Sequence, residues 1–292
     1  MITWFLFALG SAIAQSGMNA LSNQALKTRR FSKISIAFII SATASVLLIG
    51  ISFLFFGLPD FKPGFWQAIL ITGFLNVLMF PIGLKAYEVG EFSAVYSMTL
   101  ATPIFLLFTS WIFLGELPPV QGMVGVVLSV AGLWMIAGTA ADNRDVSRLA
   151  NGNALGLLVA LLASISTNFD KIAVLRSNQF IAYGIVSGVM AASYAIYLLV
   201  NKQFAKSAEK ENAFSLGIVF ILLLAGFSQA LNGVFYNFAL STGFASYTIA
   251  VKRLGVLFGV AWGWLFFKEK NISKKVLGAA VAIAGVLLIL LS

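Results

Sequence analysis

Long apolar runs separated by short polar loops fill the chain from its first residues to its last. A helix needs about 20 mostly apolar residues to cross the hydrocarbon core of a bilayer. The pattern therefore predicts an all-α integral membrane protein with ten transmembrane helices. Their expected ranges are 2–26, 34–57, 64–86, 92–114, 119–138, 153–176, 180–201, 214–240, 244–267 and 275–291.

An internal repeat underlies this pattern. A shift of 153 residues, without gaps, brings Gly90 onto Gly243, Glu116 onto Glu269 and Asn76 onto Gln229. The same shift pairs further residues, namely Ser11 with Ser164, Gln15 with Asn168, Gly125 with Gly278 and Gly132 with Gly285. We therefore expect two repeats, residues 1–140 and 152–292, joined by a loop over 141–151. Because the first span matches the sixth, it is expected to be retained and not cleaved as a signal peptide.

Each expected repeat holds five spans, and an odd number has a topological consequence. The second repeat must enter the membrane from the side opposite to the first, so the two repeats are inverted. Inverted repeats are typical of carriers that bind their substrate near the midplane and open to each face in turn.

Composition narrows the functional classes. The chain of 292 residues is 60% hydrophobic and only 10% charged, and it contains neither cysteine nor histidine. Disulfides, thiolate nucleophiles and imidazole ligands are thereby excluded, and the sequence has no phosphate-binding loop or nucleophile elbow. We expect no enzymatic activity, no cofactor and no metal.

The net charge of +9 is distributed as a topology signal. Fourteen of the 19 Lys and Arg residues lie in the loops after the first, third, fifth, seventh and ninth spans, and only Lys62 and Arg176 lie on the other face. The rule that basic loops stay in the cytoplasm predicts an inner (plasma) membrane protein with both termini outside the cytoplasm. Basic residues scattered over short loops do not indicate nucleic-acid binding.

Four charged residues fall well inside the expected spans, away from the span ends. Asp170 and Lys171 lie in the sixth span, and Lys252 and Arg253 lie at a similar depth in the ninth. Charge inside a bilayer is costly unless it is paired or faces water, so we expect Asp170 to pair with Lys252 or Arg253. The positive surplus would attract a carboxylate or phosphate. Alternatively, Lys252 and Arg253 snorkel to the headgroups and Asp170 pairs with Lys171.

Uncharged polar residues extend the candidate substrate site. Gln229, Asn232 and Tyr236 share one face of the eighth span. The further candidates are Gln15, Asn19, Asn76, Tyr96, Asn168 and Tyr247. Hydrogen bonds between helices explain such amides equally well, and the tyrosines could belong to the aromatic belts at the interfaces. Asp170 and Glu88 are the candidates for proton coupling.

Glycine and proline positions predict packing and bending. Gly255, Gly259 and Gly263 recur every fourth residue, a spacing that lets another helix approach closely. Pro81 and Pro103 are expected to kink the third and fourth spans.

The sequence resembles the drug/metabolite transporter superfamily with paired EamA-type repeats. The resemblance rests on the ten spans in two halves and on Gly115-Glu116 and Lys268-Glu269, each preceding a glycine-rich last helix. It implies a carrier, in a superfamily whose members move amino acids, nucleosides, cationic drugs, sugar nucleotides and organic phosphates. The Lys252-Arg253 pair is also similar to a phosphate-binding pair in the plastid sugar-phosphate translocators.

The leading functional hypothesis is a secondary active exporter or exchanger of a small anionic or zwitterionic metabolite. An amino acid, a carboxylate or an organic phosphate would fit it. The alternative is a proton-coupled exporter of cationic or aromatic compounds, recognised by Asp170 and Glu88; a channel and an intramembrane enzyme are more remote. The expected partners are a small solute and membrane lipid, without nucleic acid, for a monomer or homodimer.

Overall fold

The computed structural model describes residues 2–28, 31–57, 59–90, 92–138, 146–201, 216–258 and 272–292. Its named elements are all α-helices. They are α1 (Ile2–Lys27), α2 (Lys33–Phe56), α3 (Phe65–Val89), α4 (Phe92–Thr99), α5 (Thr102–Leu114), α6 (Val120–Gly138), α7 (Val146–Leu175), α8 (Gln179–Val200), α10 (Leu216–Thr242), α11 (Ala245–Arg253) and α13 (Ile272–Leu290).

These helices form the membrane bundle that the hydrophobic pattern predicts. Six helical stretches in the described part are long and apolar enough to cross a bilayer, and the apolar stretches in α6 and α13 are shorter. With α4 and α5 taken as two parts of one span, the described part of the chain holds ten helices, of which α11 is described over only nine residues. The prediction of an all-helical, multi-pass membrane fold is confirmed.

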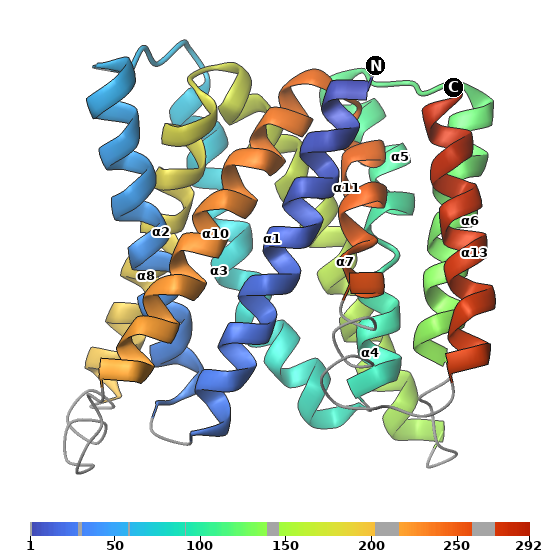
Figure 1. Cartoon of the computed structure of the whole chain (residues 1–292), viewed down its shortest axis with the longest axis horizontal. Coiled ribbons are helices and arrows are strands. Elements are labelled where there is room, and N and C mark those ends of the chain that lie inside the picture. Colours follow the sequence, from blue (N-terminus) through green and yellow to red (C-terminus); the bar gives the residue numbers. More distant parts are fainter. Residues whose placement is uncertain are drawn as a thin grey trace.

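The two halves have opposite orientations in the bundle. The N- and C-termini lie at the same end of the molecule, at the top of Figure 1. Five crossings separate the start of α1 from the start of α7, so α7 begins at the opposite end. The inverted five-helix repeats are thereby confirmed.

The repeats interlock, because the most extensive helix contacts all join one half to the other. These contacts are α6 with α13, α1 with α10, α3 with α7 and α2 with α8. The 153-residue shift relates α1 to α7 and α10 to α3, so the first-half and second-half versions of each contact correspond. This is the packing of two equivalent units about a two-fold axis in the membrane plane.

Glycines allow α6 and α13 to pack with their backbones in contact. A Cβ on Gly125 would lie 2.6 Å from the carbonyl oxygen of Gly285, and a Cβ on Gly278 would lie 2.7 Å from that of Gly132. Gly125 and Gly278 are repeat equivalents, and so are Gly132 and Gly285. Reciprocal contacts between equivalent residues are expected at a two-fold interface, and small residues permit this approach in membranes.

The fourth and ninth crossings are interrupted, which differs from the continuous helices expected over 92–114 and 244–267. α4 ends at Thr99, α5 begins at Thr102, and α11 ends at Arg253 before a turn at Leu254. The shift places Leu254 on Ala101, so both repeats break at the same point. Pro103 explains the first break, because proline lacks an N–H group and is best accommodated in the first turn of a new helix. Pro81, in contrast, lies inside the continuous helix α3.

In the second repeat Gly255 follows the break. A Cβ on Gly255 would lie 3.1 Å from the carbonyl oxygen of Ala12, so this glycine allows close approach to α1 as predicted. Gly259, Gly263 and Glu269 lie outside the described residues.

Candidate functional site

A cavity of about 180 Å³ lies inside the bundle, bounded by α3, α5, α7, α8, α10 and α11. Asp170 of α7 and Lys252 and Arg253 of α11 all line it with half-buried side chains. The other lining residues include Asn76, Thr102, Ser166, Thr167, Tyr183, Ser187 and Tyr236. Two cations and one carboxylate, from the first and fourth spans of the second repeat, thus line the same polar cavity.

Hydroxyl groups hold the Asp170 carboxylate. The Thr72 hydroxyl donates to Oδ1 at 2.5 Å and the Tyr236 hydroxyl donates to Oδ2 at 3.1 Å. Ser166 lies 2.7 Å from the Thr72 hydroxyl and one helical turn before Asp170. The expected ion pair of Asp170 with Lys252 or Arg253 is not among the contacts of the described residues, because these hydroxyls occupy the carboxylate instead.

Lys252 lies over an aromatic ring. Its Nζ is 4.1 Å from the centroid of the Tyr236 ring, within the range of a cation–π interaction. Lys252 also lies in the last turn of α11, where the helix dipole favours a positive charge. Within the described residues no carboxylate lies within ion-pair distance of it, and its side chain lines the cavity.

Arg253 contacts the helix break of the first repeat, between α4 and α5. Its Nη2 donates to the Thr102 hydroxyl at 3.1 Å, at the first residue of α5. It also interacts electrostatically with Tyr87 and Tyr96. Tyr96, a predicted substrate residue, therefore lies near this cation although it is not part of the cavity lining.

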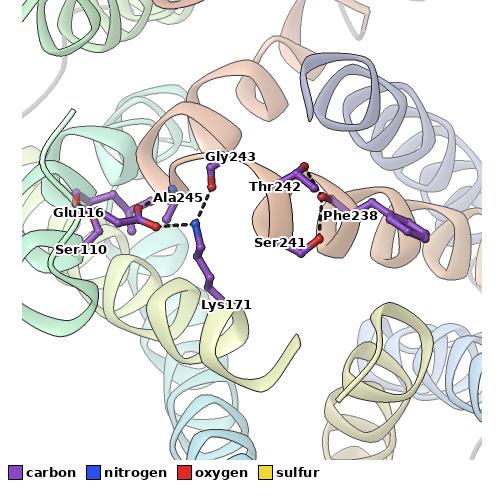
Figure 2. Close-up of polar contacts among 9 residues, drawn as sticks. Ser110, Glu116, Lys171, Phe238, Ser241, Thr242, Gly243 and Ala245 are labelled. Carbon is purple, nitrogen blue, oxygen red and sulfur yellow. Dashed lines mark hydrogen bonds and ion pairs between the residues drawn. The ribbon is translucent and has the colours of Figure 1, made fainter. Parts of the chain in front are cut away.

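Lys171 is the main departure from the predicted site. Its Nζ forms an ion pair with Glu116 and donates to the carbonyl oxygen of Gly243 at 2.5 Å, as Figure 2 shows. Glu116 also accepts the backbone N–H of Ala245 at 2.9 Å, at the N-terminus of α11. Both side chains of the pair are only 11% exposed. Lys171 is thus neutralised outside the cavity and adds no positive charge to it. Lys171 also does not form the pair with Asp170 that the alternative interpretation expected.

Glu116 is therefore a structural residue that the sequence interpretation missed. The recurrence of a glutamate at the equivalent position of the second repeat, Glu269, was its signal, but this recurrence did not show which cation Glu116 contacts. The cavity consequently carries one net positive charge from Lys252, Arg253 and Asp170, a smaller surplus than the one expected when Lys171 is counted with them.

The amide residues divide between lining and packing. Asn76 lines the cavity and donates to the Ser166 hydroxyl at 3.1 Å. Gln229 donates to the Tyr183 hydroxyl at 2.8 Å. Tyr183 lines the cavity, so Gln229 orients a lining residue that the sequence interpretation missed. Ser166 is a second lining residue that the sequence interpretation missed. Its position one helical turn before Asp170 could have revealed it, whereas no sequence pattern pointed to Tyr183.

Beside this group, α1 and α10 are joined through side chains. Asn232 donates to Gln15 at 3.0 Å and accepts from Ser11 at 2.8 Å, and Gln15 donates to Asn19 at 3.3 Å. These contacts fit the alternative interpretation, in which amides hold helices together within the membrane.

Three other predicted residues lie away from the cavity lining. Asn168 is fully buried and donates to a carbonyl one turn earlier in α7. Tyr247 packs in an apolar cluster, where its hydroxyl lies 3.0 Å from that of Ser292. Glu88 forms an exposed pair with Lys85 at 3.3 Å, which is the surface alternative to a role in proton coupling.

An apolar cluster separates the cavity from the end that carries the termini. It includes side chains from the start of α3, α8 and α11 and from the last turns of α7 and α10. Its largest members are Phe65, Leu106, Tyr236, Leu240 and Ile249. Together with the Lys171–Glu116 pair, this packing fills the termini end of the bundle.

Inverted five-helix repeats around a charged central cavity define the architecture of a membrane carrier. The profile of the EamA-like transporter family matches residues 2–138 and again residues 150–291. The chain therefore belongs to the EamA-like transporter family of the drug/metabolite transporter superfamily, and the resemblance seen in the sequence is confirmed.

Known proteins similar to this chain include a curated transporter and a protein of solved structure. "Uncharacterized transporter YvbV" of Bacillus subtilis (strain 168) is 21% identical over 228 residues, which cover 77% of this chain and 72% of the relative. A protein of solved crystal structure, described only as "Crystal structure of protein", aligns over 100% of this chain and 97% of its own. It does so with a TM-score of 0.77 at 13% identity, a likeness that shows the fold.

Proposed function

We propose that this transporter carries a small anionic or zwitterionic solute by alternating access, as an exporter or an exchanger. The observation that supports this most is the placement of Lys252 and Arg253 on one cavity with a single carboxylate, Asp170. Two cations against one anion leave a charge that a carboxylate or phosphate on the solute would balance. Ion pairs in such partly dehydrated sites are far stronger than in water.

The size of the cavity favours a small metabolite. Its 180 Å³ compares with about 300–1,000 Å³ for the sites of drug-sized ligands. An amino acid, a short carboxylate or a small organic phosphate fits this space better than a nucleotide sugar does.

Four lining residues have a role in this proposal. Lys252 binds the anionic group of the solute, and Asn76 and Tyr183 offer hydrogen bonds to its polar atoms. For a zwitterion, Asp170 receives the ammonium group. Protonation of Asp170 would remove that acceptor and release the cationic end of the solute, which couples transport to a proton gradient.

The membrane orientation is part of the proposal. The excess of basic residues in alternate loops supports an inner (plasma) membrane location with the termini outside the cytoplasm. The packed termini end would then face outward, and we infer that the solute reaches the cavity from the cytoplasm in this state.

Charge-selective labelling tests the proposal without knowledge of the solute. Ser187 lines the cavity and the chain has no cysteine, so Ser187→Cys supplies a single reactive thiol. We expect an anionic methanethiosulfonate, the sulfonatoethyl reagent, to react about tenfold faster than the cationic trimethylammonium reagent, after correction for their rates with free thiol. A charge difference of this kind corresponds to about 1.4 kcal/mol.

Lys252→Gln in the Ser187→Cys background should abolish this preference, because it makes the cavity neutral. Lys85→Gln is the matched control, since Lys85 is an exposed residue of a surface ion pair. Faster reaction of the cationic reagent would contradict the anionic assignment.

A second candidate, a proton-coupled exporter of cationic or aromatic compounds, has one observation in its favour. The Tyr236 ring already accepts the Lys252 ammonium group and adjoins Asp170, so the same ring and carboxylate could bind a solute cation. In that case the cationic reagent reacts faster and Asp170→Asn, not Lys252→Gln, removes the preference.

A further inference from the structure

We propose that Arg253 is a positioning residue that joins the two broken helices during transport, whereas Lys252 alone supplies the cation for the solute. This inference rests on the proposed alternating-access function. It assigns different tasks to two adjacent cations that line the same cavity.

The two helix breaks meet inside the bundle. Leu100, in the break between α4 and α5, and Leu254, which follows α11, are buried in the same apolar cluster. The 153-residue shift places one break on the other, so their contact lies where the two inverted repeats cross. α11 comes from the termini end and α4 from the opposite end, and both terminate at this crossing.

One hydroxyl group connects the helix ends at this crossing. Thr102 is 1% exposed, and its Oγ1 accepts from Arg253 Nη2 at 3.1 Å while donating to the carbonyl oxygen of Thr99 at 2.7 Å. Arg253 is the last residue of α11, Thr102 the first of α5 and Thr99 the last of α4. The three helix ends are therefore linked by consecutive hydrogen bonds.

Helix dipoles explain why a cation occupies this position. The C-termini of α4 and α11 both carry partial negative charge, and Arg253 lies between them. A guanidinium group can donate in several directions at once. The Lys252 ammonium instead contacts the Tyr236 ring and no described helix end of the first repeat.

This link has a mechanical consequence. Opening the termini end requires α11 to move, and opening the other end requires the equivalent movement of α4. While Arg253 holds Thr102, the two breaks move together, so one end closes as the other opens. Without the link α11 loses its connection to α4 and α5, and the change between states becomes slower.

Sided labelling of Ser187→Cys tests this assignment. The sulfonatoethyl reagent does not cross membranes and can be applied to intact cells and to inverted membrane vesicles. We expect the parent to react from both sides. Thr102→Val, which keeps the side-chain shape but removes the hydroxyl, should slow labelling from the termini end about tenfold, because hydrogen bonds to charged groups are among the stronger ones. Labelling from the other end should be unchanged, which also shows that the variant is folded.

Three further variants separate coupling from binding. Thr102→Ser keeps the hydroxyl and should restore the parental rate. Arg253→Gln removes a cavity charge as Lys252→Gln does, and in addition it should slow the termini side as Thr102→Val does; the double variant should slow that side no further. Lys252→Gln, which removes the same charge one residue earlier, should instead lower the rates from both sides by one common factor.

The outcomes distinguish this inference from the function on which it rests. Parental rates from both sides in Thr102→Val, or an Arg253→Gln variant that behaves like Lys252→Gln, would overturn the coupling role and leave the substrate proposal standing. A parent that reacts from one side only would refute alternating access, and both proposals would then fall.

Discussion

Replacing Glu116 by Gln is expected to lower the melting temperature of the purified protein by about 10 °C. The substitution removes the anion that neutralises Lys171, although the new amide oxygen can still accept the N–H of Ala245. Leaving one partner of a buried ion pair uncompensated costs about 3–5 kcal/mol, and each kcal/mol corresponds to a few degrees in a chain of this size. Intrinsic tryptophan fluorescence during heating in detergent measures the change.

Lys171→Met should cost less than Glu116→Gln, because the Glu116 carboxylate remains compensated by the N-terminus of α11. Glu88→Gln is the matched control. Glu88 forms an exposed pair with Lys85 in which the side chains are 67% and 62% exposed, and such surface pairs contribute about 0–1 kcal/mol. Equal melting temperatures for the Glu116→Gln and Glu88→Gln variants would show that the buried pair does not hold the termini end closed.

Gly132→Ala and Gly285→Ala are expected to destabilise the protein to similar extents, by about 1–3 kcal/mol each. A Cβ on Gly132 would collide with the backbone of Ala282, and a Cβ on Gly285 would collide with the backbone of Ser129. The 153-residue shift places Ala282 on Ser129, so the two substitutions create the same clash on opposite sides of the two-fold axis.

Gly50→Ala provides the control for this pair. Gly50 lies inside α2, and a Cβ there would meet nothing within 4 Å. Alanine favours a helix by about 0.5–1 kcal/mol over glycine, so this variant should be unchanged or slightly more stable. The melting temperatures of all three variants can be compared in one experiment. A large difference between Gly132→Ala and Gly285→Ala would contradict the symmetric packing of α6 on α13.

The sequence did not predict which residues, distant from one another in the chain, contact each other in the site. Asp170 and Lys252 do share the cavity, as their matching depths in the sixth and ninth spans predicted. Depth does not give the rotation of a helix about its axis, however. Lys171, next to Asp170 in sequence, consequently points to Glu116 and not to the cavity.

The sequence by itself determined the membrane class, the ten crossings and the inverted duplication. The length of the apolar runs sets the membrane class and the number of crossings, and the odd number of spans in each repeat makes the repeats inverted. Both features are visible in the linear sequence. Tertiary structure alone decided which charges are neutralised, because Glu116 and Lys171 meet across 54 residues of intervening chain. It also decided that both repeats break at the same point and that Arg253 reaches Thr102 there. Such contacts arise only when helices of opposite orientation cross, since their side-chain partners are then set by packing geometry.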